Sequence, residues 1–510
     1  MTALPERPVT FLLNGIETTV SPDRADLTLL NWLRQDKGMT GSKEGCAEGD
    51  CGACSVVVAR RDENGQITHQ AANACILFLP MIDGLSVTTV EGIAGPEGDL
   101  HPVQEAMVTH HGSQCGFCTP GFILSLFAGW RQGMTWQGMT WQRPNIEELL
   151  AGNLCRCTGY GSIVTAAESL AGMTPPKWDQ DRCEAERAWL KQHDIKDLNT
   201  MGDQPFLAPT NEADLSHAIA DHPHYQILAG ATDIGLWVTK QHRKMPGFIS
   251  VMRVEGLAKI TETESHFIIP AGVSHDQAHR HLADHYPPLD DLWKRFASAQ
   301  VRATGTVCGN IANGSPIGDL APAFLALGAE ITLRHRDQKR VLPLDQFFLG
   351  YQRQDRKDGE WLAEIALPKP AAGEQFYAVK ISRRFDQDIS AVMGAFWWQV
   401  EDGKITKARI GYGGMAAIPA RAKNTEAAVM GHDINQPLSP DVLTAITTAL
   451  SADFTPIDDV RASREYRQEM AKNLLIKSLE SAASNAPNAD TLAGFSPQTR
   501  AIIEAKGAAE

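Results

Sequence analysis

Eight of the ten cysteines fall into two groups of four, and their spacing is typical of iron–sulfur chemistry. The first group follows C-x4-C-x2-C with one distant cysteine, which is the plant-type arrangement for a [2Fe-2S] cluster. The second group pairs a C-x2-C with a later C-x-C. This pattern predicts two [2Fe-2S] clusters, which carry single electrons. The predicted ligands are Cys46, Cys51, Cys54 and Cys75 in the first quartet, and Cys115, Cys118, Cys155 and Cys157 in the second.

The first cysteine loop contains several glycines, as a tight cluster-binding loop requires. Three thiolates that face two irons leave little room for bulky side chains. We expect Gly45, Gly49 and Gly52 to supply positive-φ conformations and to turn backbone N–H groups toward the sulfurs. The fourth ligand, Cys75, would come from a separate element.

Zinc and disulfides are the two alternatives for these cysteines. Zinc favours paired C-x2-C knuckles, which C-x-C and C-x4-C fit poorly. Nothing at the N-terminus resembles a secretory signal, so a reducing cytosol disfavours disulfides. Two cysteines stay unassigned, and we expect Cys183 to be a bystander thiol in an exposed segment. The other, Cys308, is considered below.

Composition excludes several classes of function. A chain of 510 residues is expected to form three or four domains, and 43% hydrophobic with 21% charged residues is typical of a soluble globular protein. The net charge of −14 comes without a basic patch, which disfavours nucleic acid as a partner. Apolar runs such as 122–130 are too short to span a bilayer. We expect a soluble, cytoplasmic protein.

The first hundred residues carry the pattern of a small β-grasp domain around the first quartet. Asn14-Gly15 between two alternating segments is a strong hairpin signal. A turn over 62–65 follows the strand after the cysteine loop. The resulting order is that of a ferredoxin-like fold closing near Val90. The predicted strands are 9–13, 17–20 and 55–59, and a helix is predicted over 27–34.

From His101 the spacing becomes helical around the second quartet. We expect the cysteine loops to lie at helix N-termini, where the helix dipole favours thiolate charge. The tandem Gln-Gly-Met-Thr-Trp over 132–141 is interpreted as a lengthened surface loop, because repeat folds need longer units. The predicted helices begin at 101 and 146 and run over 120–130 and 163–171.

The remaining two thirds of the chain contain a candidate phosphate-binding loop. A charged stretch over 173–203 is interpreted as a linker with one amphipathic helix, 182–192. A strand over 226–229 then precedes the glycine-bounded loop 230–235 and a helix, which is an arrangement that binds phosphate by backbone amides. The signal is weak alone, and no G-x-G-x-x-G occurs. The Gly- and Asn-rich run 305–319 is either a plain loop or the surface for a flat polar ligand.

The C-terminal part is predicted to be an α+β unit with a helical end. Two long strands precede three helices, and after residue 482 the composition becomes that of a disordered tail. The predicted strands are 390–400 and 405–412, and the predicted helices are 424–430, 442–449 and 464–479.

Several motifs together resemble one family. The chain resembles the iron–sulfur/flavin subunits of bacterial xanthine dehydrogenases, of the molybdenum hydroxylase family, from about residue 9 to 475. The cysteine motifs are specific as a pair, and each flavin motif is moderately so. The segments that carry the resemblance are 45–54, 110–121, 152–160, Gly309-Asn310-Ile311, Ser315-Pro316-Ile317-Gly318-Asp319 and Tyr412-Gly413-Gly414-Met415.

The resemblance implies FAD as a cofactor and a multidomain α+β fold. The implied domains are 1–95, a plant-type ferredoxin-like [2Fe-2S] domain; 96–172, a four-helix [2Fe-2S] domain; 173–203, a linker; 204–382, an α/β FAD-binding domain of the molybdenum-hydroxylase flavoprotein type; 383–482, a C-terminal α+β flavoprotein domain; and 483–510, a disordered tail.

The implied FAD contacts are a pyrophosphate loop, an aromatic lid on the isoalloxazine and a set of polar residues. For Phe296 a place in the core is an equal alternative, and Lys380 has the alternative of a surface charge. Cys308 departs from the expected small residue, but a buried cysteine packs as a small hydrophobe. The implied contacts are Leu228, Ala229, Gly230, Ala231, Thr232, Asp233, Ile234, Gly235, Phe296, Thr306, Gly309, Asn310, Asp319, Leu362 and Lys380.

The resemblance also implies a partner chain. No segment after Leu475 matches the large molybdenum domain of the family, so a separate subunit would hold molybdopterin, in a heterotetramer of two such pairs. Gln114 resembles the family glutamine that hydrogen-bonds the pterin, with a polar helix-start residue as the alternative. The implied activity is electron transfer from hypoxanthine or xanthine hydroxylation through both clusters to FAD and then NAD, with no acid/base catalytic residue in this chain.

Three alternatives stay open. The segment 383–388 is either a loop near the flavin that affects the choice between NAD and O2 or a solvated turn. The chain is alternatively the same subunit of an aldehyde or N-heterocycle dehydrogenase, because the missing chain sets specificity. It is alternatively a stand-alone flavin/iron–sulfur redox module.

Overall fold

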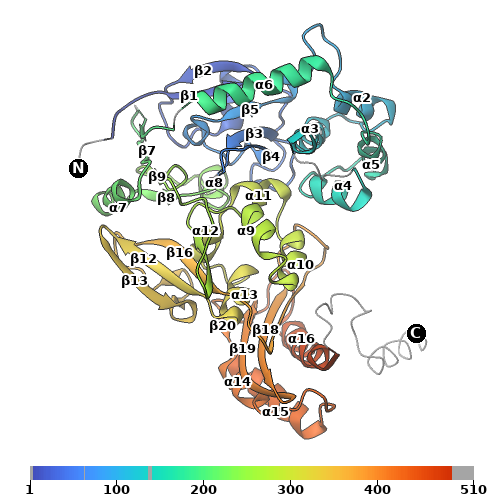
Figure 1. The fold of residues 1–510 in the computed structure, drawn as a ribbon, viewed down its shortest axis with the longest axis vertical. Helices are drawn as coiled ribbons and strands as arrows, with labels where there is room; N and C mark the ends of the chain where they lie inside the picture. Colours follow the sequence, from blue (N-terminus) through green and yellow to red (C-terminus); the bar gives the residue numbers. More distant parts are fainter. Residues whose placement is uncertain (1–3, 63, 136–140, 194, 201, 485–510) are drawn as a thin grey trace.

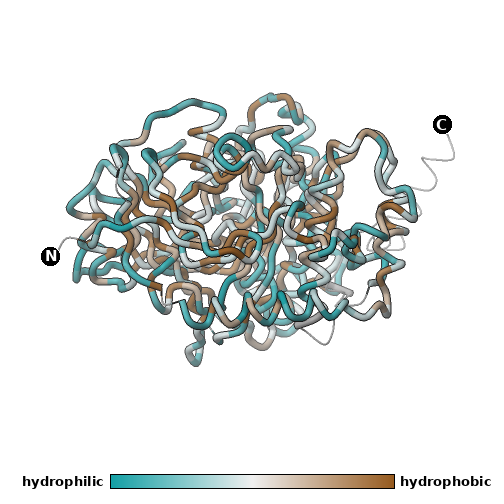
Figure 2. The backbone as a smooth tube through the Cα atoms, turned by 90° about the horizontal axis from the view of Figure 1, so that it is seen from above, coloured by the Kyte–Doolittle hydropathy of each residue, from teal (hydrophilic) through white to brown (hydrophobic). Residues whose placement is uncertain are grey.

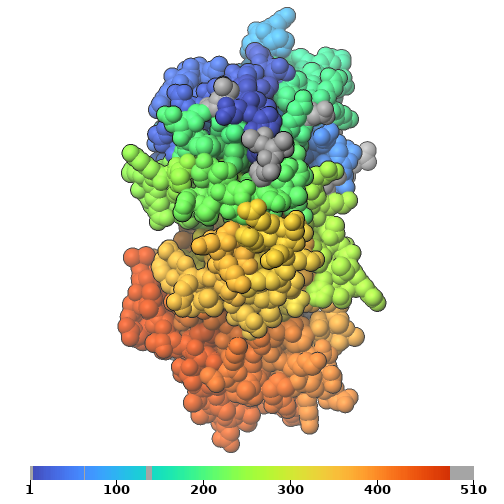
Figure 3. All heavy atoms as spheres, turned by 90° about the vertical axis from the view of Figure 1, so that its left-hand side faces the viewer, coloured from blue at the N-terminus to red at the C-terminus, as the bar shows by residue number. Residues whose placement is uncertain are grey.

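The computed structural model describes residues 4–62, 64–135, 141–193, 195–200 and 202–484. The molecule is elongated, with the N-terminal regions at one end, the central region in the middle and the C-terminal region at the other end (Figures 1 and 3). The predicted multidomain α+β class is confirmed. The predicted tail and much of the duplicated pentapeptide lie outside the described residues.

A five-stranded mixed sheet forms the ferredoxin-like region. Asn14 and Gly15 have positive φ and join the first two strands, which confirms the predicted hairpin. Thr28 caps the predicted helix, which continues into a π-helical turn. The sheet order is β2-β1-β5-β3-β4. The elements are β1 (Val9–Leu13), β2 (Ile16–Val20), α1 (Leu29–Asn31), η1 (Trp32–Asp36), β3 (Ser55–Arg61), β4 (Ile67–Asn73), η2 (Leu79–Ile82), β5 (Ser86–Thr88) and η3 (Val90–Gly92).

Four helices follow, and the longest packs against the sheet of the ferredoxin-like region. Helix α3 lies on β3 and β4, so the two iron–sulfur regions share an interface. Only α3 and α5 begin directly after the cysteine loops, whereas α2 and α4 end before them. The expectation that helix N-termini face the thiolates therefore holds for two of the four helices. The elements are α2 (Pro102–Thr109), α3 (Thr119–Thr135), α4 (Arg143–Leu150) and α5 (Gly161–Glu168).

The prediction of an exposed linker is wrong in one respect, because the helix of this segment is packed into the protein. Helix α6 (Lys177–Gln192) crosses both iron–sulfur regions (Figure 1). Its buried residues repeat at 179, 183, 186 and 190, which is the spacing of one helix face. Cys183 lies on this face and is only 2% exposed, so it is a buried thiol rather than a bystander on the surface.

Buried ion pairs hold this helix in place. The Asp179 carboxylate accepts hydrogen bonds from Arg131 at 2.6 Å and from Trp130 Nε1 at 3.1 Å. About two turns further on, Glu186 pairs with His69 Nε2 at 2.7 Å. Charged residues on α6 therefore face the interior, and their partners come from the two iron–sulfur regions.

The central region combines a small, mainly parallel sheet with a larger antiparallel sheet. The sheet orders are β6-β7-β9-β8 and β10-β11-β16-β12-β13. The first sheet contains β6 (Leu198–Asn199), β7 (Phe206–Ala208), β8 (Gln226–Leu228) and β9 (Phe248–Ser250), with helices α7 (Glu212–Asp221) and α8 (Ile234–Thr239). The second contains β10 (Thr261–Glu262), β11 (His266–Pro270), β12 (Glu330–His335), β13 (Gln338–Pro343) and β16 (Trp361–Pro368).

Helices connect these two sheets. One of them lies in a segment for which a plain loop was one of the two predicted alternatives. The run 305–319 is not a plain loop in its first half, because Thr306 caps a helix there by accepting a hydrogen bond from Gly309 N at 3.1 Å. Cys308 on this helix is 2% exposed and packs in the core as predicted. The elements are α9 (His275–Leu282), α10 (Pro287–Arg295), α11 (Ala299–Thr304), α12 (Val307–Asn313), α13 (Leu320–Leu327), η4 (Leu344–Gln346), β14 (Phe348–Gly350) and β15 (Arg353–Gln354).

The C-terminal region is an antiparallel sheet covered by helices, as predicted. Its first strand, β17, lies before the predicted boundary at residue 383 and pairs with β18 along its whole length. The elements are β17 (Glu374–Ile381), β18 (Val392–Glu401), β19 (Lys404–Gly413), β20 (Ala420–Arg421), α14 (Lys423–Val429), α15 (Pro440–Asp453) and α16 (Arg464–Ser484).

Apolar segments concentrate inside the molecule and polar segments outside, as Figure 2 shows. Within the described part of the chain, no helix has both the length and the apolar character that crossing a membrane requires.

Candidate iron–sulfur and flavin site

The first cysteine quartet comes together as predicted. Cys46 Sγ lies within hydrogen-bonding reach of both Cys51 and Cys75, and Cys54 lies within reach of Cys75. Three of these residues come from the loop before β3, and Cys75 comes from the segment after β4. All ten cysteines are free in the structure. Four free thiols that converge from two elements fit a [2Fe-2S] cluster.

Polar hydrogens point at these sulfurs. The backbone N–H groups of Asp50 and Cys51 donate to Cys46 Sγ at 3.4 and 3.3 Å. Asn73 Nδ2 donates to Cys54 Sγ at 3.8 Å. Such donors stabilise negative charge on the sulfurs and tune a cluster's potential.

Backbone conformation explains the glycines of the loop, with one correction. Gly49 and Gly52 have φ of 78° and 70°, as predicted. Gly45 is not among the residues with positive φ, and the non-glycine residue Ala47 has φ of 55° instead. A Cβ atom at Gly45 would lie 2.8 Å from Cys51 Sγ, so this position needs glycine for space around the sulfurs.

The second quartet also comes together, but at the surface. Cys115 lies within hydrogen-bonding reach of Cys157, and Cys118 within reach of Cys155. Cys115 and Cys157 are exposed, as is the neighbouring Gln114. Phe117 and Tyr160, beside the same sulfurs, are also exposed large apolar side chains. The second quartet is therefore accessible to another molecule, whereas Cys54 and Cys75 of the first are buried.

The two quartets are connected through a short backbone contact. Leu154 N, one residue before Cys155, donates to the carbonyl oxygen of Cys51 at 3.0 Å. Glycine makes the approach possible, since a Cβ atom at Gly52 would lie 2.2 Å from Gly152 O. This contact places the second quartet next to the first.

A buried glutamine that the sequence analysis missed joins three regions at the same junction. Gln300 Nε2, from α11, donates to Ser55 Oγ at 3.2 Å, Ser125 Oγ at 3.3 Å and Asn153 Oδ1 at 3.0 Å. Ser55 donates its own proton to Gly52 O, and Ser125 donates to Asn153 Oδ1. All three oxygens are therefore acceptors toward the glutamine amide, and they share its two hydrogens.

The predicted pyrophosphate loop lies against the loop before α12. A Cβ atom at Gly230 would lie 1.9 Å from Thr304 O, and one at Gly305 would lie 3.2 Å from Thr232 Oγ1. Two glycine-bounded loops from separate elements thus touch, and the glycines at the contact are buried. Side chains at these two glycine positions would fill the space at the contact. With glycines there, the two loops form a cradle that fits the diphosphate of FAD.

The structure brings some of the predicted FAD contacts together. Lys380 is buried and pairs with Asp319 at 2.7 Å, so the alternative of a surface charge is wrong. Lys380 Nζ also donates to the carbonyl oxygen of Arg295, next to the half-buried Phe296. Leu362 lies on β16 in the core of the larger sheet. Phe296, Asp319 and Lys380 therefore form one neighbourhood.

The segment 383–388 lies near the first cysteine loop. Asp388 accepts hydrogen bonds from the backbone N–H groups of Arg383 and Arg384 at 2.8 and 2.9 Å, which fixes a turn. Burial and the nearby Cys46 thiolate raise the pKa of Asp50 above its usual value, and the charge of Arg384 opposes this rise. The turn therefore lies near Asp50 of the first cysteine loop.

A pH dependence of stability follows from His275, whose ring centroid lies 4.7 Å from that of Phe296. Burial, with the charge of Arg302, lowers the pKa of His275 to about 3. The unfolded chain binds a proton at this residue below about pH 6.5. Between these two pH values the unfolded state therefore holds more protons, and stability decreases as the pH is lowered. We expect a loss of about 1 kcal/mol from this residue between about pH 7 and about pH 5.5.

Urea unfolding at the two pH values measures this loss. His275→Gln should reduce the difference between the two pH values, whereas replacement of the exposed His224 should leave it unchanged. An equal pH dependence in the His275 variant and the wild type would contradict the assignment.

Fold and site together define an iron–sulfur flavoprotein. Residues 89–168 match the family described as "[2Fe-2S] binding domain", and residues 199–370 match "FAD binding domain in molybdopterin dehydrogenase". Residues 377–482 match "CO dehydrogenase flavoprotein C-terminal domain". The chain is an iron–sulfur/FAD module of the molybdenum hydroxylase family.

Relatives extend this result. Xanthine dehydrogenase 2 of Arabidopsis thaliana is 30% identical over 85% of this chain and 37% of its own length. Xanthine dehydrogenase of Oryza sativa subsp. japonica is 31% identical over 82% of this chain and 36% of its own. The chain thus spans less than two fifths of these relatives. A solved carbon monoxide dehydrogenase chain from Hydrogenophaga pseudoflava is 25% identical, with a TM-score of 0.51, over 55% of this chain and 97% of its own.

Proposed function

We propose that this chain is the electron-transfer subunit of a xanthine dehydrogenase. Electrons from purine hydroxylation at a molybdenum site on a partner chain would pass through two [2Fe-2S] clusters to FAD and then to NAD. One observation carries the proposal: a partly exposed thiol quartet lies next to a more buried one, and the loop of the more buried one contacts the region that matches an FAD-binding family, where Thr239 Oγ1 donates to Ala47 O. This order gives electrons an entrance, a connection and an end point.

Each part of the route has residues suited to it. Cys115, Cys118, Cys155 and Cys157 would hold the outer cluster, and Cys46, Cys51, Cys54 and Cys75 the inner one. When bound, the clusters pass single electrons and FAD pairs them for hydride transfer to NAD. The backbone N–H groups that point at Cys46 stabilise the charge of its thiolate. The cradle formed by Gly230 and Gly305 would hold the diphosphate, and Phe296 would lie beside the isoalloxazine ring.

The exposed face around the outer quartet is the proposed contact with the molybdenum chain. Gln114, Phe117 and Tyr160, which are close to Cys115 and Cys157 in the sequence, are exposed as well. Exposed apolar side chains around a redox centre are typical of a surface that a partner protein covers. A partner on this face would bring its pterin close to the outer cluster, with Gln114 available to hydrogen-bond it. We include in the proposal a heterotetramer of two such pairs in the cytoplasm.

Metal and flavin analysis of the purified complex tests the proposal. We expect about four irons and one FAD per chain, with molybdenum in a larger co-purifying subunit, and bleaching of the visible absorbance by xanthine. Bleaching by an aldehyde or an N-heterocycle instead would assign another hydroxylase of the family. A lone iron–sulfur flavoprotein without a molybdenum partner would indicate a stand-alone redox module, and zinc in place of iron would remove the electron route itself.

A further inference from the structure

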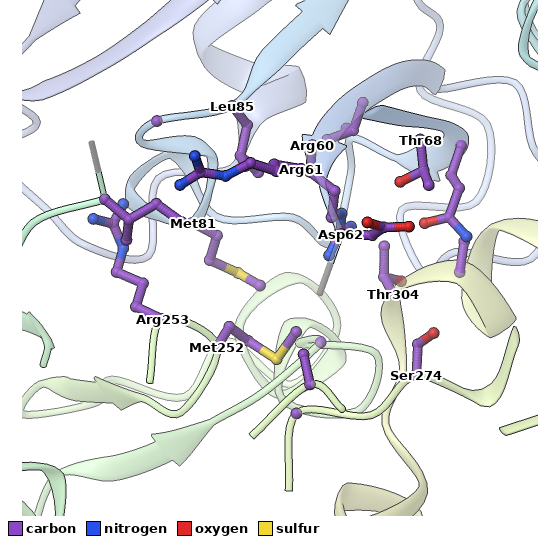
Figure 4. A pocket seen from close by; sticks show the side chains of 18 of the residues that line it. Arg60, Arg61, Asp62, Thr68, Met81, Leu85, Met252, Arg253, Ser274 and Thr304 are labelled. Atoms are coloured by element: carbon purple, nitrogen blue, oxygen red, sulfur yellow. The ribbon is translucent and has the colours of Figure 1, made fainter. Parts of the chain in front are cut away.

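A cavity of about 320 Å³ lies between the β3–β4 hairpin and the central region (Figure 4). Its volume is in the range of small-molecule sites. Among the predicted FAD contacts, only Ala229 and Gly230 line it, whereas Phe296, Asp319 and Lys380 do not. The cavity is therefore on the back of the predicted pyrophosphate loop, and no role proposed so far uses it.

The hairpin presents a polar face to this cavity, with the Arg60 guanidinium, the Thr68 hydroxyl and the Asp62 carboxylate on it. Arg60 pairs with Thr68, and Val58 pairs with Gln70, in the register of β3 and β4. Side chains two residues apart on a strand share a face, and all four residues line the cavity. Arg60 is thus directed at the central region by strand geometry.

Arg60 lacks a counter-ion within the described part of the chain. Its side chain makes no hydrogen bond or ion pair there, and its Nε is buried without a partner. Burial lowers the pKa of the Arg60 guanidinium. An uncompensated charge in such a place is unfavourable, and an anion that it can hydrogen-bond would offset the cost. By contrast, Arg253 on the same cavity is already paired with Asp83 at 2.5 Å.

The rest of the lining suits a ligand with one apolar and one anionic part. Met81 and Met252 lie in the middle of the view in Figure 4, with Ser274 and Thr304 on one side. Methionine side chains adapt to flat ligands, and the Ser274 hydroxyl can donate to a phosphate oxygen, whereas the Thr304 hydroxyl already donates to Gln300 O. Together with Arg60, these residues match the two halves of a nucleoside phosphate.

We propose that this cavity binds a nucleoside phosphate separate from FAD, with Arg60 and Thr68 on the phosphate and the two methionines against the base. Because Ala229 and Gly230 form part of its wall, the bound nucleotide contacts the back of the FAD loop.

Calorimetric titration of the FAD-loaded protein with ADP tests the proposal. We expect saturable binding by the wild type and about tenfold weaker binding by Arg60→Gln, because a charge-assisted hydrogen bond is lost. Thr68→Val keeps a β-branched residue on the strand and should weaken binding by a smaller factor, so it serves if the arginine variant is unstable. Replacement of the exposed Arg353 by glutamine is the matched control and should leave ADP binding unchanged.

The flavin content of the same samples separates this site from the FAD site. A separate site requires that FAD content stays constant in Arg60→Gln while ADP binding weakens. The proposal is overturned if ADP fails to bind the loaded wild type, or if Arg60→Gln binds as tightly as the wild type. It is also overturned if ADP binds only flavin-free protein and competes with FAD, because the cavity would then belong to the flavin.

Discussion

Cys54→Ala is expected to remove one [2Fe-2S] cluster and to lower the iron content from about four to about two irons per chain. Cys54 is 2% exposed, and its sulfur faces Cys75 inside the first quartet. No other cysteine is placed to substitute, because the outer quartet uses its own four and Cys308 lies in the central core. Flavin reduction by xanthine in the complex should be lost, since the inner cluster connects the outer one to FAD. Iron analysis and the rate of flavin bleaching measure the two effects.

Cys183→Ala is the matched control, because Cys183 is equally buried but lies on α6 away from both quartets. It should keep full iron content and flavin reduction. Cys118→Ala should also lose about two irons, but from the outer cluster, so direct chemical reduction of the flavin should survive in it. Full iron content in Cys54→Ala would show that the inner quartet holds no cluster.

The parts of the site that the sequence predicted correctly are those that local spacing determines. Cluster ligands on one loop must follow a fixed spacing, so the first three thiols could be grouped from the chain alone. The hairpin at Asn14-Gly15 and the long amphipathic elements are local in the same sense. Gly45 shows the limit even there, because its role is space beside Cys51 Sγ rather than a positive φ.

Polar residues of α6 explain why the predicted exposure of this segment was wrong. Asp179 and Glu186 have the composition of a solvated helix, and their burial depends on Arg131 and His69, which lie 48 and 117 residues away. A charged residue in a sequence pattern is predicted to be exposed. The pattern contains no signal for a distant partner that neutralises the charge and allows it to be buried.

Contacts between regions were missed for the same reason. Gln300 reaches Ser55 across 245 residues and fits only because three acceptors converge on it. A glutamine at the start of a short helix carries no local signal of that role. The cavity at Arg60 likewise depends on how the hairpin sits against the central region, which the sequence did not predict.

Lys380→Met is expected to destabilise the chain by about 3–5 kcal/mol and to lower its FAD content. The side chains of Lys380 and Asp319 are 1% and 5% exposed, and their charged atoms lie 2.7 Å apart. Methionine fills a similar volume but leaves the Asp319 carboxylate buried with only the Ser390 hydroxyl, at 2.5 Å, as a donor. The Lys380 amine also donates a hydrogen bond to Asp388 O at 2.9 Å. The substitution removes this bond, so the turn beside the flavin region should loosen as well.

Urea unfolding followed by flavin release measures this loss. Lys423→Met is the matched control, because Lys423 is mostly exposed and contacts Asp345 at 3.6 Å, and its removal should change stability by less than about 1 kcal/mol. The double variant Lys380→Met, Asp319→Asn should recover part of the loss, because it removes the buried charge together with its partner. Equal losses in the single and double variants would show that the lysine acts through packing rather than charge.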